Sequence, residues 1–320
     1  ENTLINKKFN GVKPELNSYK AFKKSDVIID FTVPNCTLEI LKIASKMKKK
    51  VFAIIGDPIT HSLSPTLHNY WFDKYKIDAD YSLLEIKERN LESITNKIRN
   101  KELSGINITL PYKQKIIPFI DKLINDAKST NSVNTIFLDE TNTLVGENTD
   151  VFGLQAAYLK EINEAKNKKA LVIGAGGVSP SVIFALQKSR INNISIINRT
   201  HEKSLFLKKK FDFLNILNWS SLMQEISNFD IIINATSLGL KNGEDFEFSF
   251  DDVKNNMIYI DTIYNPLETK TLKYLKENKI KTFNGLDMFI YQGQKSFYLW
   301  NKINPEIDDQ LINLLVSKLK

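Results

Sequence analysis

The segment Lys169-Ala-Leu-Val-Ile-Gly-Ala-Gly-Gly-Val-Ser-Pro180 constrains the fold more than any other part of the chain. Its apolar start predicts a buried strand, the glycines predict a tight turn, and Pro180 suits the first turn of a helix. A strand, a glycine turn and a helix N-terminus form a site for a pyrophosphate, because N–H groups and the positive end of the helix dipole point at it.

The glycine turn matches the dinucleotide-binding fingerprint only in part. Gly174, Gly176 and Gly177, with Ala175 between the first two, supply a turn in which the backbone can approach a ligand closely. Ser179 stands where the fingerprint has its third glycine. The turn alone therefore leaves an ordinary strand-to-helix connection open as an alternative.

A second apolar strand, residues 194–197, follows one βαβ length later and ends in Asn198-Arg199-Thr200. An acidic residue at this position would bind the ribose hydroxyls of NAD, whereas Arg199 offers a cation and a planar donor fork to a 2′-phosphate. The predicted cofactor is therefore NADP. Lys203 adds a second positive charge to this pocket, unless it is only a solvated lysine of a surface helix.

Composition narrows the class of protein. The 320 residues, 42% of them hydrophobic, can bury a large core, and the length favours two domains. Lys and Arg exceed Asp and Glu by 44 to 37, but they are scattered, which argues against a nucleic-acid partner. Cys36 is the only cysteine and histidines number three, so we expect no disulfide, no metal site and a cytoplasmic location.

No apolar run in the sequence is long enough to span a membrane, so we expect no membrane partner. The expected partner is instead a small-molecule substrate. We expect the protein to act as a monomer or homodimer.

The first 50 residues differ from the rest. Residues 26–33 predict a buried strand, Pro34 ends it, and Thr37 caps a predicted helix. This βα unit resembles an internal segment of the nucleotide-binding domain of dihydrodipicolinate reductase. Neither that family's opening glycine loop nor its catalytic half is present, so we expect residues 1–50 to be a fragment or gene-fusion remnant without activity.

Two hydroxyl side chains follow the predicted strand 51–55. Ser62 and Ser64 lie just before a helix that Pro65 opens. Each hydroxyl can donate and accept, which suits a carboxylate or a polyol. A plain helix cap is the alternative.

The segment 105–113 predicts a strand with one polar face, because apolar residues alternate with Asn107 and Thr109. Lys113 follows just past this strand and is either a surface charge or a proton donor. Asp150 lies at a later turn, and near Lys113 it would form an acid–base pair. Sequence spacing does not establish that proximity.

Residues 51–320 resemble the shikimate dehydrogenase family, whose members reduce 3-dehydroshikimate with NADPH. The matching motifs of the first half are Ser62-Leu-Ser64-Pro65 with His68-Asn69, Asn107-Ile-Thr109-Leu-Pro-Tyr-Lys113, Val133-Asn134-Thr135 and Asn148-Thr149-Asp150. Those of the second half are Gly174-Ala-Gly-Gly177, Asn198-Arg-Thr200, Asn234-Ala-Thr-Ser-Leu-Gly239, Asp261 with Tyr264-Asn265-Pro266, and Gly285-Leu286 with Tyr291-Gln292-Gly293.

The resemblance implies a role for residues of each motif. It implies that Lys113 and Asp150 form the catalytic pair. The implied substrate contacts are Ser62, Ser64, Thr109, Asn134, Tyr264 and Gln292. The implied NADP contacts are Gly174, Ala175, Gly176, Gly177, Asn198, Arg199, Thr200, Lys203, Thr236, Ser237 and Gly285.

The chain departs from the family pattern at two positions. Val151 follows Asp150 where the family usually has glycine, and Asp287 stands in the motif that the family usually writes Gly-Leu-Gly-Met. Neither change removes a catalytic group. We expect them to affect turnover rather than the identity of the reaction.

The predicted fold is α/β. An α/β substrate domain covers residues 51–152, a Rossmann-type NADP-binding domain covers 153–284, and helices in 285–320 return to the first domain. The expected function is NADPH-dependent, reversible reduction of 3-dehydroshikimate to shikimate, in chorismate and aromatic amino acid biosynthesis. The alternatives are a quinate/shikimate dehydrogenase that uses NAD(P), and a non-catalytic NADP-binding sensor.

Overall fold

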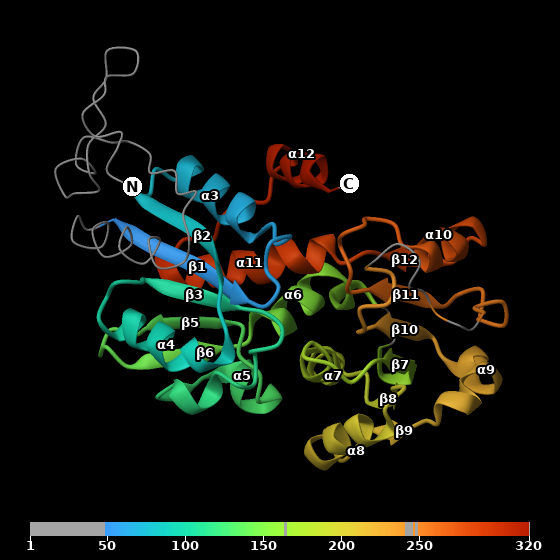
Figure 1. Cartoon of the computed structure of the whole chain (residues 1–320). Coiled ribbons are helices and arrows are strands. Elements are labelled where there is room, and N and C mark those ends of the chain that lie inside the picture. Colours follow the sequence, from blue (N-terminus) through green and yellow to red (C-terminus); the bar gives the residue numbers. More distant parts are fainter. Residues whose placement is uncertain (1–48, 163–164, 241–245, 247–248, 320) are drawn as a thin grey trace, which may run out of the picture.

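The computed structural model describes residues 49–162, 165–240, 246 and 249–319. The strand and helix expected between residues 26 and 50 lie outside this part of the chain. Figure 1 shows two layered α/β units side by side, one built from residues around the first sheet and the other around the second. The α/β fold class is confirmed.

The first sheet has the strand order β2-β1-β3-β5-β6-β4. β1 runs parallel to β2 and β3, β5 runs antiparallel to both β3 and β6, and β4 is parallel to β6. Its strands are β1 Lys50–Gly56, β2 Ala79–Glu85, β3 Gly105–Ile108, β4 Lys122–Leu123, β5 Thr135–Leu138 and β6 Leu144–Glu147.

The second sheet is parallel throughout, with the order β12-β11-β10-β7-β8-β9. Its strands are β7 Lys169–Ile173, β8 Asn193–Ile197, β9 Asn215–Ile216, β10 Ile231–Asn234, β11 Ile258–Asp261 and β12 Lys281–Phe283. The order reverses at β7, because the chain runs outward through β8 and β9 and then returns to build β10 on the other side.

Helices cover both faces of each sheet, which is why the central strands are apolar throughout (Figure 1). Successive residues of a strand point to opposite faces. In β7, Ala170 and Val172 therefore pack into one core, and Leu171 and Ile173 pack into the other.

The helices include a long one, α11, that returns from the second unit to the first (Figure 1). It packs against α6, which carries the chain from the first sheet toward the second. The helices are α3 Ser64–Lys74, α4 Leu91–Arg99, α5 Asn125–Thr130, α6 Thr149–Ala157, α7 Ser179–Lys188, α8 His201–Lys210, α9 Leu222–Glu225, α10 Lys270–Glu277, α11 Leu286–Asn301 and α12 Asp309–Lys318.

The crossing of α6 and α11 is close because Gly153 has no side chain. A Cβ atom at this position would lie 2.7 Å from the carbonyl oxygen of Met288 and 3.1 Å from the backbone nitrogen of Gln292. A larger residue would push the two helices apart.

The polar face predicted for strand 105–113 is present but does not face solvent. Asn107 is buried, and its amide donates to the carbonyl oxygen of Asn134 and to side chains on β5 and α11. The strand ends at Ile108, so Leu110, predicted to continue its apolar face, lies beyond the strand with 55% of its surface exposed.

A layer of aromatic rings fills the core between the first sheet and helices α3 and α11. Its centre is His68, which is fully buried and stacks on Tyr81 at 4.5 Å between ring centroids, with the planes 10° apart. Neither ring nitrogen of His68 has a hydrogen-bond partner among the described residues. Burial without a partner penalises the charged form and lowers the pKa of His68 from 6.5 to about 3.

This lowered pKa predicts an acid-sensitive fold. Between pH 6.5 and about 3 the unfolded chain binds a proton at His68 that the folded chain does not, so stability falls as the pH falls, by at most about 1.4 kcal/mol per pH unit. His68→Phe removes this proton, so the free energy of unfolding should depend less steeply on pH, by up to about 1.4 kcal/mol per pH unit. Urea unfolding between pH 4.5 and 7 measures this slope. His61→Gln, which removes an exposed histidine of the same segment, is the control. An unchanged slope in His68→Phe would contradict the assignment.

Candidate active site

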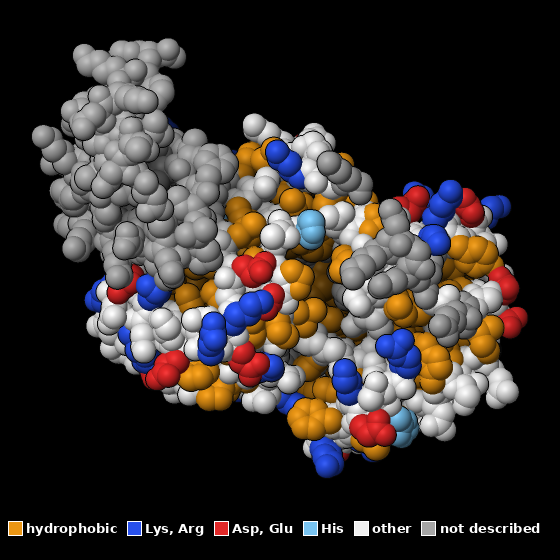
Figure 2. Space-filling model, viewed as in Figure 1, with side chains coloured by type: hydrophobic (Ala, Val, Ile, Leu, Met, Phe, Trp, Pro, Cys, Tyr) orange, Lys and Arg blue, Asp and Glu red, His pale blue; other side chains and the backbone are white. Residues whose placement is uncertain are grey.

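One cavity of about 790 Å³ lies between the two sheets. Figure 2 shows the surface hollowed between the two units, with hydrophobic side chains lining the hollow. All nineteen residues expected to contact substrate or cofactor, from Ser62 to Gln292, line this cavity. The structure therefore brings together side chains that lie up to 230 positions apart in the sequence.

Strand direction explains why these residues meet. β1, β3 and β6 point the same way, so the segments after them, which carry Ser62, Lys113 and Asp150, emerge at one edge of the first sheet. β5 runs in the opposite direction, and Asn134 reaches the same edge because it precedes that strand. This edge faces the carboxyl ends of the second sheet across the cavity.

Lys113 and Asp150 form an ion pair in the cavity wall. Lys113 Nζ lies 2.6 Å from Asp150 Oδ2, and the two side chains are 12% and 7% exposed. Asp150 lies in the first turn of α6, where its backbone N–H donates to the Asn148 side chain that caps the helix. The carboxylate is thereby fixed next to the ammonium, at a point where both reach the cavity.

The amide of Asn134 is held in one orientation. Its Oδ1 accepts from the Thr149 backbone N–H at 2.8 Å, so its Nδ2 points to Asp150 Oδ1 at 2.8 Å and to Gln292 Oε1 at 3.4 Å. Gln292 comes from α11, and its own amide nitrogen, Nε2, donates to the carbonyl oxygen of Phe289. These side chains offer polar atoms at fixed places around the Lys113 and Asp150 pair.

The two serines reach the cavity from the segment after β1, at the same edge of the first sheet. Ser62 Oγ donates to Ser64 Oγ at 3.1 Å, and Tyr264 is hydrogen-bonded to Ser62. Burial raises the pKa of Tyr264, and its ring stacks on Phe289 with centroids 4.6 Å apart. Three hydroxyls from two segments therefore meet at one end of the cavity.

The glycine turn has the shape of a phosphate cradle. Gly174 has φ +112°, and a Cβ there would lie 2.8 Å from the carbonyl oxygen of Ala235. At Gly176 a Cβ would find Ala235 O as its nearest described atom, 3.8 Å away, so this part of the turn borders open space. Ser179, in place of the third glycine, is buried, accepts from Gly176 N–H and donates to Gly174 O, which closes the turn.

The turn lies where a nucleotide binds in parallel sheets. β7 and β10 are neighbours at the point where the strand order reverses, so a crevice opens beyond their carboxyl ends, where Gly174 and Thr236 line the cavity. Arg199 and Lys203 bring two cations to the same cavity, beyond the end of β8. The cradle and the cations fit a pyrophosphate with a further phosphate.

Several cavity residues were not among the expected contacts. Asp57 and His61 lie between β1 and α3, with Asp57 paired to Lys87 at 2.8 Å. Trp219 lines the cavity too, and Leu110 contacts the glycine turn, since a Cβ at Gly177 would lie 2.6 Å from its Cδ2. Their positions depend on loops between elements, for which the sequence gives no periodic signal.

The two departures from the family pattern lie outside the cavity wall. Val151 is fully buried in the core of the second unit, next to Leu154. Asp287 is exposed in the first turn of α11 and is not among the residues that line the cavity, although its neighbour Met288 is.

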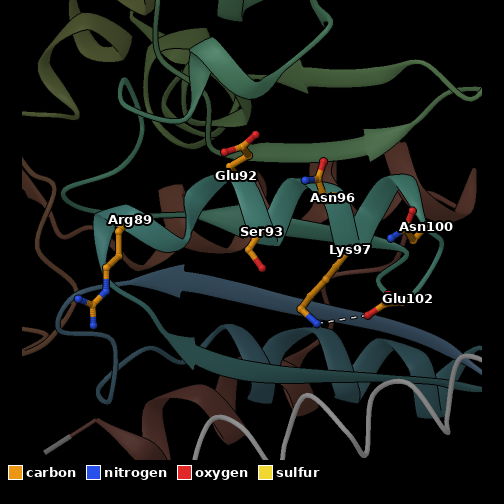
Figure 3. A pocket seen from close by; sticks show the side chains of 7 residues that line it. All are labelled: Arg89, Glu92, Ser93, Asn96, Lys97, Asn100 and Glu102. Atoms are coloured by element: carbon orange, nitrogen blue, oxygen red, sulfur yellow. Dashed lines mark hydrogen bonds and ion pairs between the residues drawn. The ribbon is translucent and has the colours of Figure 1, made fainter.

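A second pocket, of about 440 Å³, lies on the outer side of α4 (Figure 3). Polar side chains of the helix and the following turn line it, with Lys97 paired to Glu102 at 3.2 Å. It contains none of the residues expected at a site. Within the described ranges, no three His, Cys, Asp or Glu side chains are placed to share a metal ion, and no helix has both the length and the apolar character of a membrane span.

Comparison with protein families gives three matches. The model of the shikimate dehydrogenase substrate binding domain matches residues 54–136, and that of shikimate / quinate 5-dehydrogenase matches residues 157–280. The N-terminus of dihydrodipicolinate reductase matches residues 2–56 and so ends within β1.

Individual relatives agree with these matches. The chain is 46% identical over 267 residues to shikimate dehydrogenase (NADP(+)) of Pelagibacter ubique, covering 83% of this chain and 99% of the relative. The crystal structure of shikimate dehydrogenase from Aquifex aeolicus superposes with a TM-score of 0.76 at 34% identity, over 83% and 97% of the two chains. The crystal structure of shikimate 5-dehydrogenase from Thermus thermophilus, in complex with NADP(H) and shikimate, superposes with a TM-score of 0.75 at 28% identity. The match covers 84% of this chain and 100% of that one.

The geometry of the glycine turn predicts different costs for two similar substitutions. Gly174→Ala should lower the free energy of unfolding by about 1–3 kcal/mol, because its φ is positive and a Cβ meets backbone. Gly176→Ala should change it by less than about 0.5 kcal/mol, since the added methyl enters open space. Thermal or denaturant unfolding without ligand measures both. Equal losses in the two variants would contradict the observed turn.

Proposed function

The chain belongs to the shikimate dehydrogenase family, and from this we propose that it catalyses the reversible, NADPH-dependent reduction of 3-dehydroshikimate to shikimate, in the chorismate route to aromatic amino acids. The observation that carries the proposal is the 2.6 Å pair of Lys113 and Asp150 in the cavity that the glycine turn and Arg199 also line. Substrate and nicotinamide cofactor would share this cavity.

Lys113 is the proposed proton donor. Reduction of a ketone places a hydride on carbon and a proton on oxygen, so an acid must lie within hydrogen-bond reach of that oxygen. The ammonium of Lys113 gives its proton to the forming alkoxide and is left neutral, and Asp150 stays ionised and holds Lys113 in place. In the reverse direction the neutral Lys113 takes the proton from the shikimate hydroxyl.

The proposed substrate contacts follow from the chemistry of the side chains that line the cavity. The hydroxyls of Ser62 and Ser64 bind the ring carboxylate, and Tyr264 supports Ser62. Asn134 and Gln292 bind ring hydroxyls beside Asp150. Thr109 lies on the same cavity wall as Lys113 and contributes one more hydroxyl.

The residues of the second unit fit NADP. The cofactor supplies the hydride when it is bound. The glycine turn, comprising Gly174, Ala175, Gly176 and Gly177, would hold the pyrophosphate. Arg199, with Asn198, Thr200 and Lys203, would bind the 2′-phosphate. Thr236, Ser237 and Gly285 also line the cavity and would border the nicotinamide.

We further propose a division of labour along the chain. Residues 51–152 form the substrate domain, 153–284 the NADP-binding domain, and 285–320 the helices that return to the substrate domain. Residues 1–50 are proposed to be a reductase-derived remnant without its own chemistry, since only the N-terminal part of that family matches. We propose a cytoplasmic enzyme that acts as a monomer or homodimer.

The purified chain should form NADPH from shikimate and NADP, followed at the nicotinamide absorbance, faster than from quinate or with NAD. Lys113→Ala should lower kcat by about 10²–10⁴-fold with the KM for NADP nearly unchanged, because only the proton transfer is lost. Lys115→Ala is the matched control, since Lys115 is an exposed lysine paired with Glu88 outside the cavity.

Loss of activity in both lysine variants, or in neither, would contradict the assignment of Lys113 as the acid. No activity of the unchanged chain with any substrate and cofactor pair would overturn the proposed reaction and favour an NADP-binding sensor. Comparable rates with quinate would extend the proposal to a quinate/shikimate dehydrogenase.

Cofactor preference tests the role of Arg199. Arg199→Asp should lower the ratio of kcat/KM for NADP to that for NAD by roughly ten- to a hundredfold, because a charge-assisted contact to the 2′-phosphate becomes a repulsion. Lys209→Asp, on helix α8 that follows Arg199 but outside the cavity, should leave the ratio unchanged. An unchanged ratio in Arg199→Asp would remove the proposed phosphate contact.

A further inference from the structure

Three buried hydroxyls meet behind the substrate side of the cavity. Thr135 on β5, Thr149 on α6 and Ser296 on α11 are fully buried, and we call them the hydroxyl cluster. Ser296 Oγ lies 2.8 Å from Thr135 Oγ1 and 3.1 Å from Thr149 Oγ1, and the two threonine hydroxyls are 3.4 Å apart. None of the three was expected to act in the site.

The hydroxyl cluster fixes the amide of Asn134. Asn134 Oδ1 receives hydrogen bonds from Thr135 Oγ1 at 3.0 Å and Thr149 Oγ1 at 3.1 Å, in addition to the Thr149 backbone N–H. With its oxygen occupied on this side, the amide can turn only its nitrogen toward Asp150 and Gln292.

Ser296 joins the cluster to helix α11. It lies one helical turn after Gln292, and its hydroxyl donates to the Gln292 carbonyl oxygen at 3.0 Å. Since a hydroxyl has one proton and two lone pairs, Ser296 is then left as an acceptor for its other partners. It accepts from Asn107 Nδ2 at 3.1 Å. The Thr135 and Thr149 hydroxyls also lie within hydrogen-bond distance of Ser296, and each has a single proton that goes either to Ser296 or to Asn134 Oδ1.

The position of Gln292 depends on these bonds and on the helix crossing. On one side, the absence of a side chain at Gly153 lets α11 approach α6 to backbone contact at Gln292. On the other side, Ser296 ties the same helix to β3, β5 and α6. Removal of the Ser296 hydroxyl would remove the hydrogen bonds that join α11 to these elements and would leave buried donors without an acceptor.

We propose that Ser296 is a positioning residue for the reaction. It holds the side chains of Gln292 and Asn134 at fixed positions relative to the Lys113 and Asp150 pair. The inference rests on the proposed function, because Gln292 and Asn134 are its proposed contacts to the ring hydroxyls. Ser296 does not line the cavity and so acts only through these two side chains.

The test compares Ser296→Ala with Ser204→Ala. Both serines are fully buried on helices, but Ser204 Oγ has no hydrogen-bond partner in the described residues. Ser296→Ala should lower kcat/KM for shikimate about tenfold, with the KM for NADP unchanged, as expected for misplaced substrate contacts. Ser204→Ala should leave both constants unchanged. Equal effects of the two substitutions, or none from Ser296→Ala, would overturn the proposal.

A double-mutant cycle separates positioning from a general loss of packing. Because Ser296 acts in part through Gln292, Ser296→Ala should lower the rate by a smaller factor in a Gln292→Ala background than in the unchanged chain. Losses that multiply would overturn the proposal. Thr135→Val and Thr135→Ser provide a second pair, in which only Thr135→Ser should keep the rate, because Val fills the same volume without the hydroxyl.

The two proposals fail in distinguishable ways. Absence of shikimate oxidation in the unchanged chain counts against the proposed function. Full shikimate oxidation that Ser296→Ala leaves intact counts against Ser296 alone. The unfolding midpoint of Ser296→Ala should lie below that of Ser204→Ala, because only Ser296 has hydrogen bonds to lose. A raised KM for NADP in Ser296→Ala would assign Ser296 a purely structural role.

Discussion

The direction of the strands determines where this protein can act. The segments that follow β1, β3 and β6, and the one that precedes β5, all reach the same edge of the first sheet. The second sheet is parallel throughout, so its loops also gather at one edge. Because these edges face each other, side chains of many segments share one cavity, and neither unit alone holds a complete set.

The cavity wall is kept rigid by hydrogen bonds among buried polar groups. Such groups are costly unless they are paired, and here the amides of Asn107 and Asn134 each have several partners. The network extends to β2 through Tyr81, whose hydroxyl donates to Asn107 Oδ1 at 2.7 Å.

Much of this site could be predicted from the sequence, because local patterns mark it. Glycines after an apolar strand identify the turn at Gly174, and polar side chains after strands identify Ser62 and Lys113. The 2.6 Å approach of Lys113 to Asp150 then confirms the proximity that spacing alone did not establish. The roles of these residues in catalysis stay predictions.

What the sequence did not reveal depends on contacts between distant segments. Ser296 stands between Lys295 and Phe297 on α11, where no pattern marks it, and only the return of that helix to the first sheet brings it to Thr135. The burial of Asn107 has the same cause. Leu110 shows the reverse, an apolar residue at strand spacing that leaves the sheet and lies on the glycine turn of the other unit.

The return of α11 also has a consequence for how the chain is made. One face of the first sheet, with Phe52 and Ile54, is covered by α3 and by residues of α11 and α12 such as Phe297 and Leu311. The ribosome synthesises the sheet early and most of this cover last, after the whole second sheet. During translation the first unit therefore keeps an apolar face incompletely covered, while the second sheet, whose strands and helices α7 to α10 are contiguous in sequence, can be completed first. A chain stopped before residue 286 would keep the glycine turn but lack Gln292, and its exposed face would favour aggregation or binding by a chaperone.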